Sequence, residues 1–469
     1  MGDSSSHRIP RDLDLVASIL ASARANGGEF ADLFAEQREF TSLSLEDGKL
    51  EKVSAGSDAG AGIRVISTGR TSHAVTTGLD SKSLREAAAS AAAASSAPAR
   101  PVAALSPYIS PLAFQCLRPP HDVEVSEKIA LLRAADRIAR SVSSSVLQVS
   151  AGYRDVVQHV VVANSSGVFA EDERIYTTCT IHVVASGNGI VQTAYESVGG
   201  NAGFEILSLE LVEQLAEKTA RRAVRMLSAP QAPSGRMPVV ISSLSGGTMI
   251  HEAIGHGLEA DLSGQGLSVF AGKLGKQVAS PLVTVVDDAT LPSRRGSFRI
   301  DDEGTPSQRT VLVENGMLVS YMYDRLTAMK EQRESTGNGR RESFRHRPIP
   351  RMTNTFIAPG ASDPDGILQS VEHGLYVEKI GGGQVNTVTG DFVFDVQEAC
   401  LIEKGQRGEP VRGATLSGNG PRVLKEIDMV GNDLGFSIGT CGKDAQGVPV
   451  SDAMPTVRIP ELVVGGIHS

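Results

Sequence analysis

The segment PVVISSLSGGTMIHEAIGHGLEAD, residues 238–261, predicts a strand that leads directly into a helix. Residues 238–242 are an apolar run of strand length. Ser245 or Thr248 is suited to cap the helix, because a hydroxyl oxygen accepts hydrogen bonds from the first free backbone N–H groups. The buried side of this helix is predicted to consist of Met249, Ile250, Ala253 and Ile254.

Three polar residues on this helix, His251, Glu252 and His256, indicate metal-dependent hydrolysis. Imidazole is a common zinc ligand, and a carboxylate beside a metal-activated water can serve as general base. The histidines are five residues apart, which separates them by about 140° on a regular α-helix, against about 40° in the usual His-Glu-x-x-His motif. We therefore expect a widened, π-type turn or a helix end at residues 251–256, with Gly255 as the position where distortion costs least.

A catalytic zinc site needs a third protein ligand. Glu259 and Asp261 are close in sequence and have suitable carboxylates. Cys441 is the third candidate, because it lies between glycine-rich turns and could present a thiolate. The residues alone leave these candidates open, and two histidines with a glutamate could also be ordinary polar residues without a metal.

The residues before this segment predict an N-terminal α+β domain at residues 1–227. The order helix, strands, helix occurs twice there, which indicates a duplication. The stretch SAPQAPSGRMP, residues 228–238, is rich in Pro, Gly, Ser and Ala and is predicted to be a linker. Strand-like runs dominate residues 239–469, so we expect a C-terminal, mostly antiparallel β domain with one or two helices, one of which carries the metal site. The predicted fold class is α+β with two domains.

The composition of the chain limits the kinds of partner that it can bind and the compartments in which it can work. The chain has 469 residues, and its net charge of −9 gives no electrostatic case for nucleic-acid binding, which needs a basic face. No apolar run reaches the length of a membrane span, and the first residues lack the apolar stretch of a secretory signal. The four cysteines show no paired spacing. We therefore expect a cytoplasmic protein that binds neither nucleic acid nor membrane.

Several segments resemble one known family in both content and order. The HEAIGHGLEAD segment is similar to the metal motif of the TldD/PmbA (TldE) peptidases. Further similar segments are residues 300–328, 345–360, 381–405 and 414–443, and the resemblance extends less distinctly to the N-terminal half. TldE-type members lack the His-Glu-x-x-x-His motif, whereas His251, Glu252 and His256 are all present here. The resemblance thus implies the metal-binding branch, with the family's cysteine ligand at Cys441.

The same resemblance implies a function. It points to a Zn²⁺-dependent peptidase that hydrolyses short or unfolded peptides and forms a heterodimer with a TldE/PmbA-like partner. Zinc would be held by His251, His256 and Cys441, with Glu252 as general base. The alternatives are a metal-dependent hydrolase of a non-peptide amide or ester, and a non-catalytic metal-binding subunit.

Other polar residues admit two interpretations. Arg351, Asn354 and the acidic residues 301–303 could contact a peptide. They could equally be turn and strand-end residues.

Overall fold

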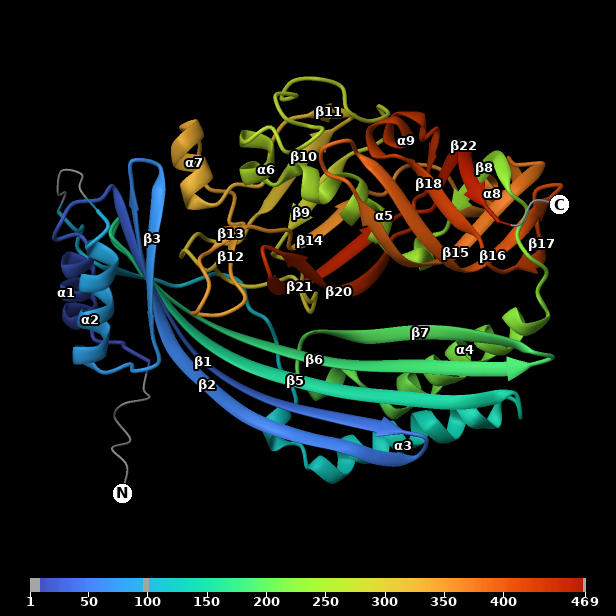
Figure 1. Cartoon of the computed structure of the whole chain (residues 1–469), viewed down its shortest axis with the longest axis horizontal. Helices are drawn as coiled ribbons and strands as arrows, with labels where there is room; N and C mark the ends of the chain where they lie inside the picture. Colours follow the sequence, from blue (N-terminus) through green and yellow to red (C-terminus); the bar gives the residue numbers. More distant parts are fainter. Residues whose placement is uncertain (1–8, 96–100, 467–469) are drawn as a thin grey trace.

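The computed structural model describes residues 9–95 and 101–466. The absence of a secretory signal was expected from residues 1–12, of which residues 1–8 lie outside this range. The fold is α+β with two domains, as predicted. Figure 1 shows a long curved sheet in the N-terminal half and a β-rich C-terminal domain lying over one face of it.

The N-terminal sheet is built from unusually long strands. Its order is β3-β2-β1-β5-β6 with β7 beside β6, and all of these neighbours are antiparallel. Asp47 and Gly48, both with positive φ, form the tight turn between the first two strands, and Asp-Gly is a pair that favours such turns. The strands are β1 (Phe30–Glu46), β2 (Lys49–Ser67), β3 (Arg70–Thr76), β5 (Val146–Asn164), β6 (Val168–Gly187) and β7 (Ile190–Asn201), and a short β4 (Ser106–Tyr108) pairs in parallel with the start of β6.

Four helices cover the sheet, and they follow the predicted repeat of helix, strands, helix. The first pair, α1 (Leu13–Ala23) and α2 (Ser81–Ala92), lies at one end, and α3 (Val125–Ser141) and α4 (Leu209–Ser228) lie under the other (Figure 1). Each pair closes its own apolar core. Asp12, Asp80 and Ser208 cap three of these helices by accepting backbone hydrogen bonds.

The opposite face of the sheet contacts the C-terminal domain. Phe34 and Val162 pack there against Ile300 and Phe344. Buried charges lie beside this apolar contact, where Arg64 pairs with both Asp32 and Glu303; the distance from Arg64 Nη2 to Glu303 Oε1 is 2.7 Å. The two domains are therefore joined by a contact that is partly apolar and partly ionic.

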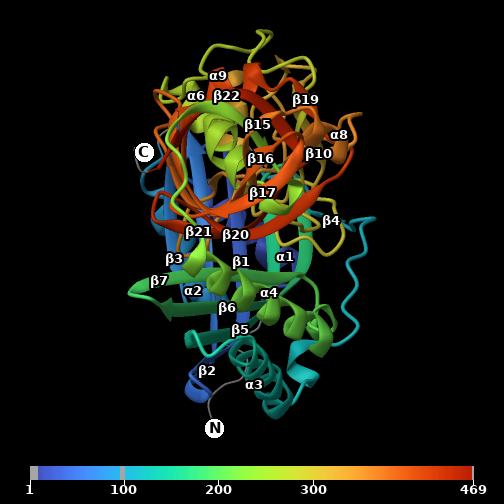
Figure 2. The same ribbon diagram turned by 90° about the vertical axis from the view of Figure 1, so that its right-hand side faces the viewer.

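The C-terminal domain contains two main sheets. One has the order β15-β8-β22-β18-β16-β17, and a further β15–β16 pairing closes it into a barrel. Figure 2 shows its strands as a rounded wall above α4 and β7. The strands are β8 (Gly235–Ile241), β15 (His373–Val385), β16 (Asp391–Glu403), β17 (Gln406–Val411), β18 (Thr415–Asn419), β19 (Met429–Val430) and β22 (Val457–Gly465).

The second sheet ends at a free edge that matters for the site. Its order is β11-β10-β9-β14-β21-β20, so β20 is its last strand. The pairings β8–β15 and β14–β21 are parallel, and the other pairings between named strands of the domain are antiparallel. The strands are β9 (Val285–Asp288), β10 (Arg309–Glu314), β11 (Met317–Leu318), β14 (Asn354–Ile357), β20 (Gly435–Lys443) and β21 (Gln446–Met454), with a separate pair β12 (Gly339–Arg340) and β13 (Ile349–Pro350).

The expectation of one or two helices in this domain was too low. The described residues contain five short α-helices there, each of three to seven residues, which is too short to show helical periodicity in sequence. They are α5 (Thr248–Ile250), α6 (Ala260–Gly264), α7 (Arg325–Glu331), α8 (Pro364–Gln369) and α9 (Gly420–Glu426). No helix within residues 9–95 and 101–466 has the length and apolarity needed to cross a membrane.

The interdomain ion cluster gives a first testable prediction. Arg64→Ala should lower the melting temperature of the chain, because Asp32 and Glu303 would remain buried without their shared cation, at a cost of about 3–5 kcal/mol. Thermal unfolding followed by circular dichroism measures the change. Arg70→Ala, on the exposed strand β3, is the control and should shift it little. Equal melting temperatures for both variants would contradict a stabilising role for the cluster.

Candidate metal centre

The helix that carries the histidines is irregular, as their spacing predicts. A single α-turn, Thr248–Ile250, is followed by a π-helical segment, His251–Gly255, and then by a 3₁₀ turn, His256–Leu258. The His256 N–H donates to the His251 carbonyl, five residues back, which is the π pattern. This widened turn brings both imidazoles to the same side.

Two details of the helix differ from expectation. Neither Ser245 nor Thr248 is its cap, because the N-cap is Gly247 and Ser245 Oγ instead accepts a hydrogen bond from Ile380 N at 3.0 Å. Gly255 has ordinary right-handed helical φ and ψ, so its backbone freedom is not used. Glycine is needed here for lack of space, because a Cβ at this position would overlap the sulfur of Met352.

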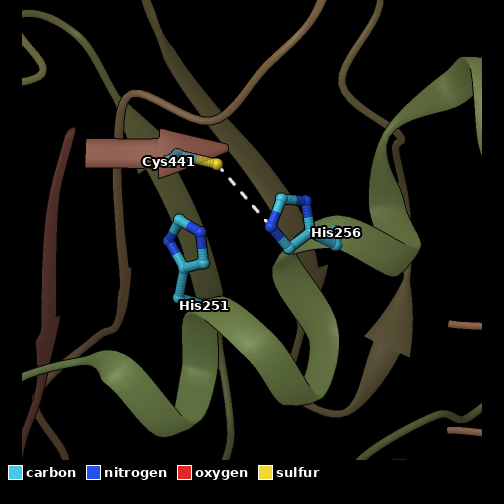
Figure 3. A group of neighbouring side chains, drawn as sticks. All are labelled: His251, His256 and Cys441. Carbon is cyan, nitrogen blue, oxygen red and sulfur yellow. Dashed lines mark hydrogen bonds between the residues drawn. The ribbon is translucent and has the colours of Figure 1, made fainter. Parts of the chain in front are cut away.

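The structure brings His251, His256 and Cys441 together. Their ligand atoms all lie within 4.8 Å of one another, and Cys441 reaches the pair from the edge strand β20 (Figure 3). The Sγ of Cys441 is 3.6 Å from Nε2 of His256, and the two imidazole rings meet edge to face with centroids 4.8 Å apart. Of the three candidates for a third ligand, Cys441 is the one found in this group.

Each imidazole is held in place by a carboxylate. Nδ1 of His251 lies 2.8 Å from Oδ1 of Asp452, and Nδ1 of His256 lies 3.0 Å from Oε2 of Glu259. When Nδ1 donates to a carboxylate, Nε2 keeps its lone pair free to bind a metal, and this pairing is usual for metal-binding histidines.

Glu259 and Asp261 are not among the three grouped ligands, and Glu259 contacts the group only through Nδ1 of His256. Both accept from Lys443, whose Nζ is 3.1 Å from Glu259 Oε2 and 2.7 Å from Asp261 Oδ1. Asp452 and Lys443 were missed by the sequence analysis. Lys443 is two residues from Cys441, whereas Asp452 is 201 residues from His251 and reaches it from strand β21.

The electrostatics of the trio suit a metal cation. Burial opposes charge on the Cys441 thiol, but hydrogen bonds and positive charge from His251 and His256 lower its pKa to about 5. Burial also opposes charge on His256, while Glu259 and Cys441 raise its pKa to about 10. The group thus favours a thiolate beside imidazoles that hold protons, and a metal cation can replace those protons. A thiolate with two imidazoles is a donor set that fits zinc and leaves a fourth position open.

Glu252 faces the same space as the trio. It lines two adjoining clefts, of about 340 and 510 Å³, that His251 also lines. Burial raises the pKa of its carboxyl above the ordinary value, and the nearby His251 and His256 act in the opposite direction. Glu252 is therefore positioned to exchange a proton with a molecule in these clefts.

The other polar residues singled out in sequence have structural partners. The Arg351 side chain is fully buried and donates to the carbonyls of Cys441 and Gln446. Asn354 donates to Asp288 O at 2.6 Å, and Asp301 accepts from three backbone N–H groups within its own loop and β12. The interpretation of these residues as turn and strand supports is the one that their contacts favour.

Comparisons with known proteins identify the class. Models of the PmbA/TldA metallopeptidase family match residues 31–95 (domain 1), 118–227 (central domain) and 234–466 (C-terminal domain). A metalloprotease TldD homolog from Haemophilus influenzae is 39% identical over 450 residues, covering 94% of this chain and 93% of that protein. These matches make the chain a metallopeptidase, which is a hydrolase. It belongs to the TldD/PmbA family.

Solved structures show the same fold. A Thermotoga maritima protein superposes with a TM-score of 0.81 at 22% identity, covering 96% of this chain and 99% of its own. TldE from Thermococcus kodakarensis superposes with a TM-score of 0.74 at 18% identity, covering 96% and 100%. At these identities the likeness concerns the fold alone.

The ligand set gives the second prediction. Purified protein should contain about one zinc per chain, and Cys441→Ser should lose most of it, because an alcohol is a poor substitute for a thiolate. Metal content after gel filtration, measured by plasma mass spectrometry, is the readout. Cys116→Ser, outside the group, is the matched control and should keep its zinc. Full zinc retention in Cys441→Ser would remove this residue from the site.

The carboxylate behind His251 gives the third prediction. Asp452→Asn should weaken metal binding roughly 10- to 100-fold, because the amide no longer holds the ring with a charged acceptor. Competition with a fluorescent chelator measures the affinity. Asp428→Asn, at a more exposed ion pair with Arg458, is the control. If Asp452→Asn bound metal as tightly as the wild type, His251 would not depend on this partner.

Proposed function

We propose that this metallopeptidase uses zinc, held by His251, His256 and Cys441, and that Glu252 is its general base. The observation that carries the proposal is the convergence of two imidazoles, one cysteine and one glutamate on the same clefts. When bound, zinc supplies Lewis acidity toward a water molecule and toward a substrate carbonyl. The donor set of this site supports that choice of metal.

In the proposed reaction, Glu252 performs the proton transfers. Its carboxylate accepts a proton from the attacking water and later delivers the proton to the leaving amine, so that atoms and charges balance over one hydrolysis. Asp452 and Glu259 hold the imidazoles in one tautomer throughout. A purely structural zinc site would fill all four positions with protein ligands, and the described group offers three.

The proposed substrate is a short or unfolded peptide bound through its backbone. Strand β20 is at the end of its sheet and carries Cys441, so an extended peptide can add to its free edge by main-chain hydrogen bonds. Across the clefts lie the glycines of β15, residues 381–383, which offer backbone and no side chain. Contacts to backbone groups would allow many different sequences to bind.

We further propose a TldE/PmbA-like partner and a cytoplasmic location. Enclosure of the clefts by a partner would keep folded proteins away from the site. The TldE structure from Thermococcus kodakarensis has the same fold, which supports a pairing of two similarly built subunits. The four cysteines are free, which suits a reducing compartment.

The test combines a peptide library with a folded control protein, using the zinc-loaded chain with and without a TldE-like partner. The wild type should cleave many library sequences and leave the folded control intact. Glu252→Gln should keep its zinc but lose cleavage by about 10²- to 10⁴-fold, because an amide cannot accept the proton. Glu314→Gln, exposed on β10, is the control variant and should be fully active.

Two results would overturn this function. Full activity in Glu252→Gln would remove the general base, and efficient digestion of the folded control would contradict a site restricted to unfolded peptides. Hydrolysis of simple esters or amides without any peptide cleavage would instead favour a non-peptide substrate.

A further inference from the structure

A cavity of about 190 Å³ lies between the N-terminal sheet and the β20–β21 hairpin. Its walls come from β1, β5 and β6 on one side and from Thr440, Gly447 and Pro449 on the other. Positive charge dominates the lining, with six arginines against two carboxylates. The charged residues are Arg38, Arg154, Arg174, Arg295, Arg340, Arg341, Asp302 and Glu342.

Two of these arginines are neutralised within the protein. Nη1 of Arg174 lies 2.7 Å from Asp302, and Arg341 lies 3.5 Å from Asp32. They belong to the buried ion cluster that joins the two domains. Their charges are balanced by carboxylates of the protein itself.

The other four have no carboxylate within 4.0 Å among the described residues. Arg340 is buried and donates only to the carbonyls of Met352 and Pro449, which are neutral. The side chains of Arg38 and Arg154 have no hydrogen-bond partner in the described part of the chain. These cations therefore face the cavity region without a close ion-pair partner, and Glu342 is the nearby carboxylate in the lining that acts on Arg154.

The free energy of this arrangement favours an anion. Burial lowers the pKa of Arg340 to about 10, although Asp302 acts in the opposite direction. For Arg154, burial and the nearby charge of Arg38 lower the pKa, and Glu342 opposes them. Like charges held together in a partly dry space repel, and a bound anion would relieve that repulsion. Guanidinium groups also match carboxylates in shape, because their N–H groups can donate two parallel hydrogen bonds.

The cavity adjoins the metal centre through one residue. Thr440 lines the cavity and also both clefts that Glu252 lines. Arg295 donates to Thr440 Oγ1 at 3.2 Å and to Gly439 O at 3.1 Å, so its guanidinium lies against the residue that precedes Cys441. A peptide on the edge of β20 would thus have the cationic cavity within reach.

We propose that this arginine cavity binds a carboxylate of the peptide substrate, either the C-terminal carboxylate or an Asp or Glu side chain. The inference rests on the proposed function, since it requires a peptide at the edge of β20. Binding there would make the site selective for charged peptides, whereas its other proposed contacts involve only the peptide backbone. Peptides that present a carboxylate at the correct distance would be preferred over neutral ones.

The experiment measures binding without turnover, using the full chain, zinc-loaded, in a Glu252→Gln background. Three N-terminally labelled peptides of one neutral sequence are compared by fluorescence anisotropy: the free acid, its C-terminal amide, and the amide with one residue replaced by Glu. The free acid or the Glu peptide should bind about tenfold or more tighter than the neutral amide, as expected for charged hydrogen bonds. Whichever of the two gains affinity identifies the source of the carboxylate.

Adding Arg38→Gln and Arg154→Gln should remove most of this difference while leaving the neutral amide bound as before. Neither side chain has a hydrogen-bond partner among the described residues, so the variant should fold normally. Arg70→Gln with Arg133→Gln, two exposed arginines elsewhere, is the matched control. Equal affinity for all three peptides would overturn the carboxylate site alone. A failure of every peptide to bind, with the TldE-like partner present as well as absent, would overturn the proposed peptide substrate too.

Discussion

The metal centre depends on one constraint: two imidazoles five residues apart must point to one place. A regular α-helix would turn them about 140° away from each other. The π-helical segment His251–Gly255 removes that separation, and it is held by packing on both sides. Ile250 and Ile254 are buried in the barrel core, and Gly255 lets Met352 approach the backbone where a side chain would collide. The distorted turn is therefore part of the core, and its geometry cannot relax without disturbing that packing.

The β20–β21 hairpin completes what the helix begins. Cys441 comes from β20, and Asp452, which orients His251, comes from β21. Their pairing fixes both at once, because a slip of one residue along a strand would turn Cys441 to the opposite face. Glu259 is tied to the same hairpin through Lys443. The helix and the hairpin therefore depend on each other. Asp452 of the hairpin orients His251, and Lys443 of the hairpin holds Glu259, which orients His256.

Local sequence signals predicted much of this fold, but they could not predict contacts between residues far apart in the sequence. The repeat of helix, strands, helix, the Asp47-Gly48 turn and the irregular helix at His251 follow from periodicity, turn chemistry and ligand spacing. The role of Asp452 could not be predicted, because its contact with His251 joins residues 201 positions apart in the sequence. The sequence analysis explained Gly255 by its backbone freedom, but glycine is required there because Met352 packs too close for a side chain. The five short C-terminal helices lack enough turns to produce a periodic pattern.

Strand β20 borders two regions of opposite electrostatic character. Cys441 points to the imidazoles, where a thiolate is stabilised by positive charge and a cation can bind. Thr440, the residue before it, lines the arginine cavity on the side of the N-terminal sheet. Thr440 also lines both clefts of the metal centre, so this edge strand borders a cation-binding centre and an anion-attracting cavity at adjacent residues. This arrangement needs both domains, because β20 belongs to one and Arg38 and Arg154 belong to the other.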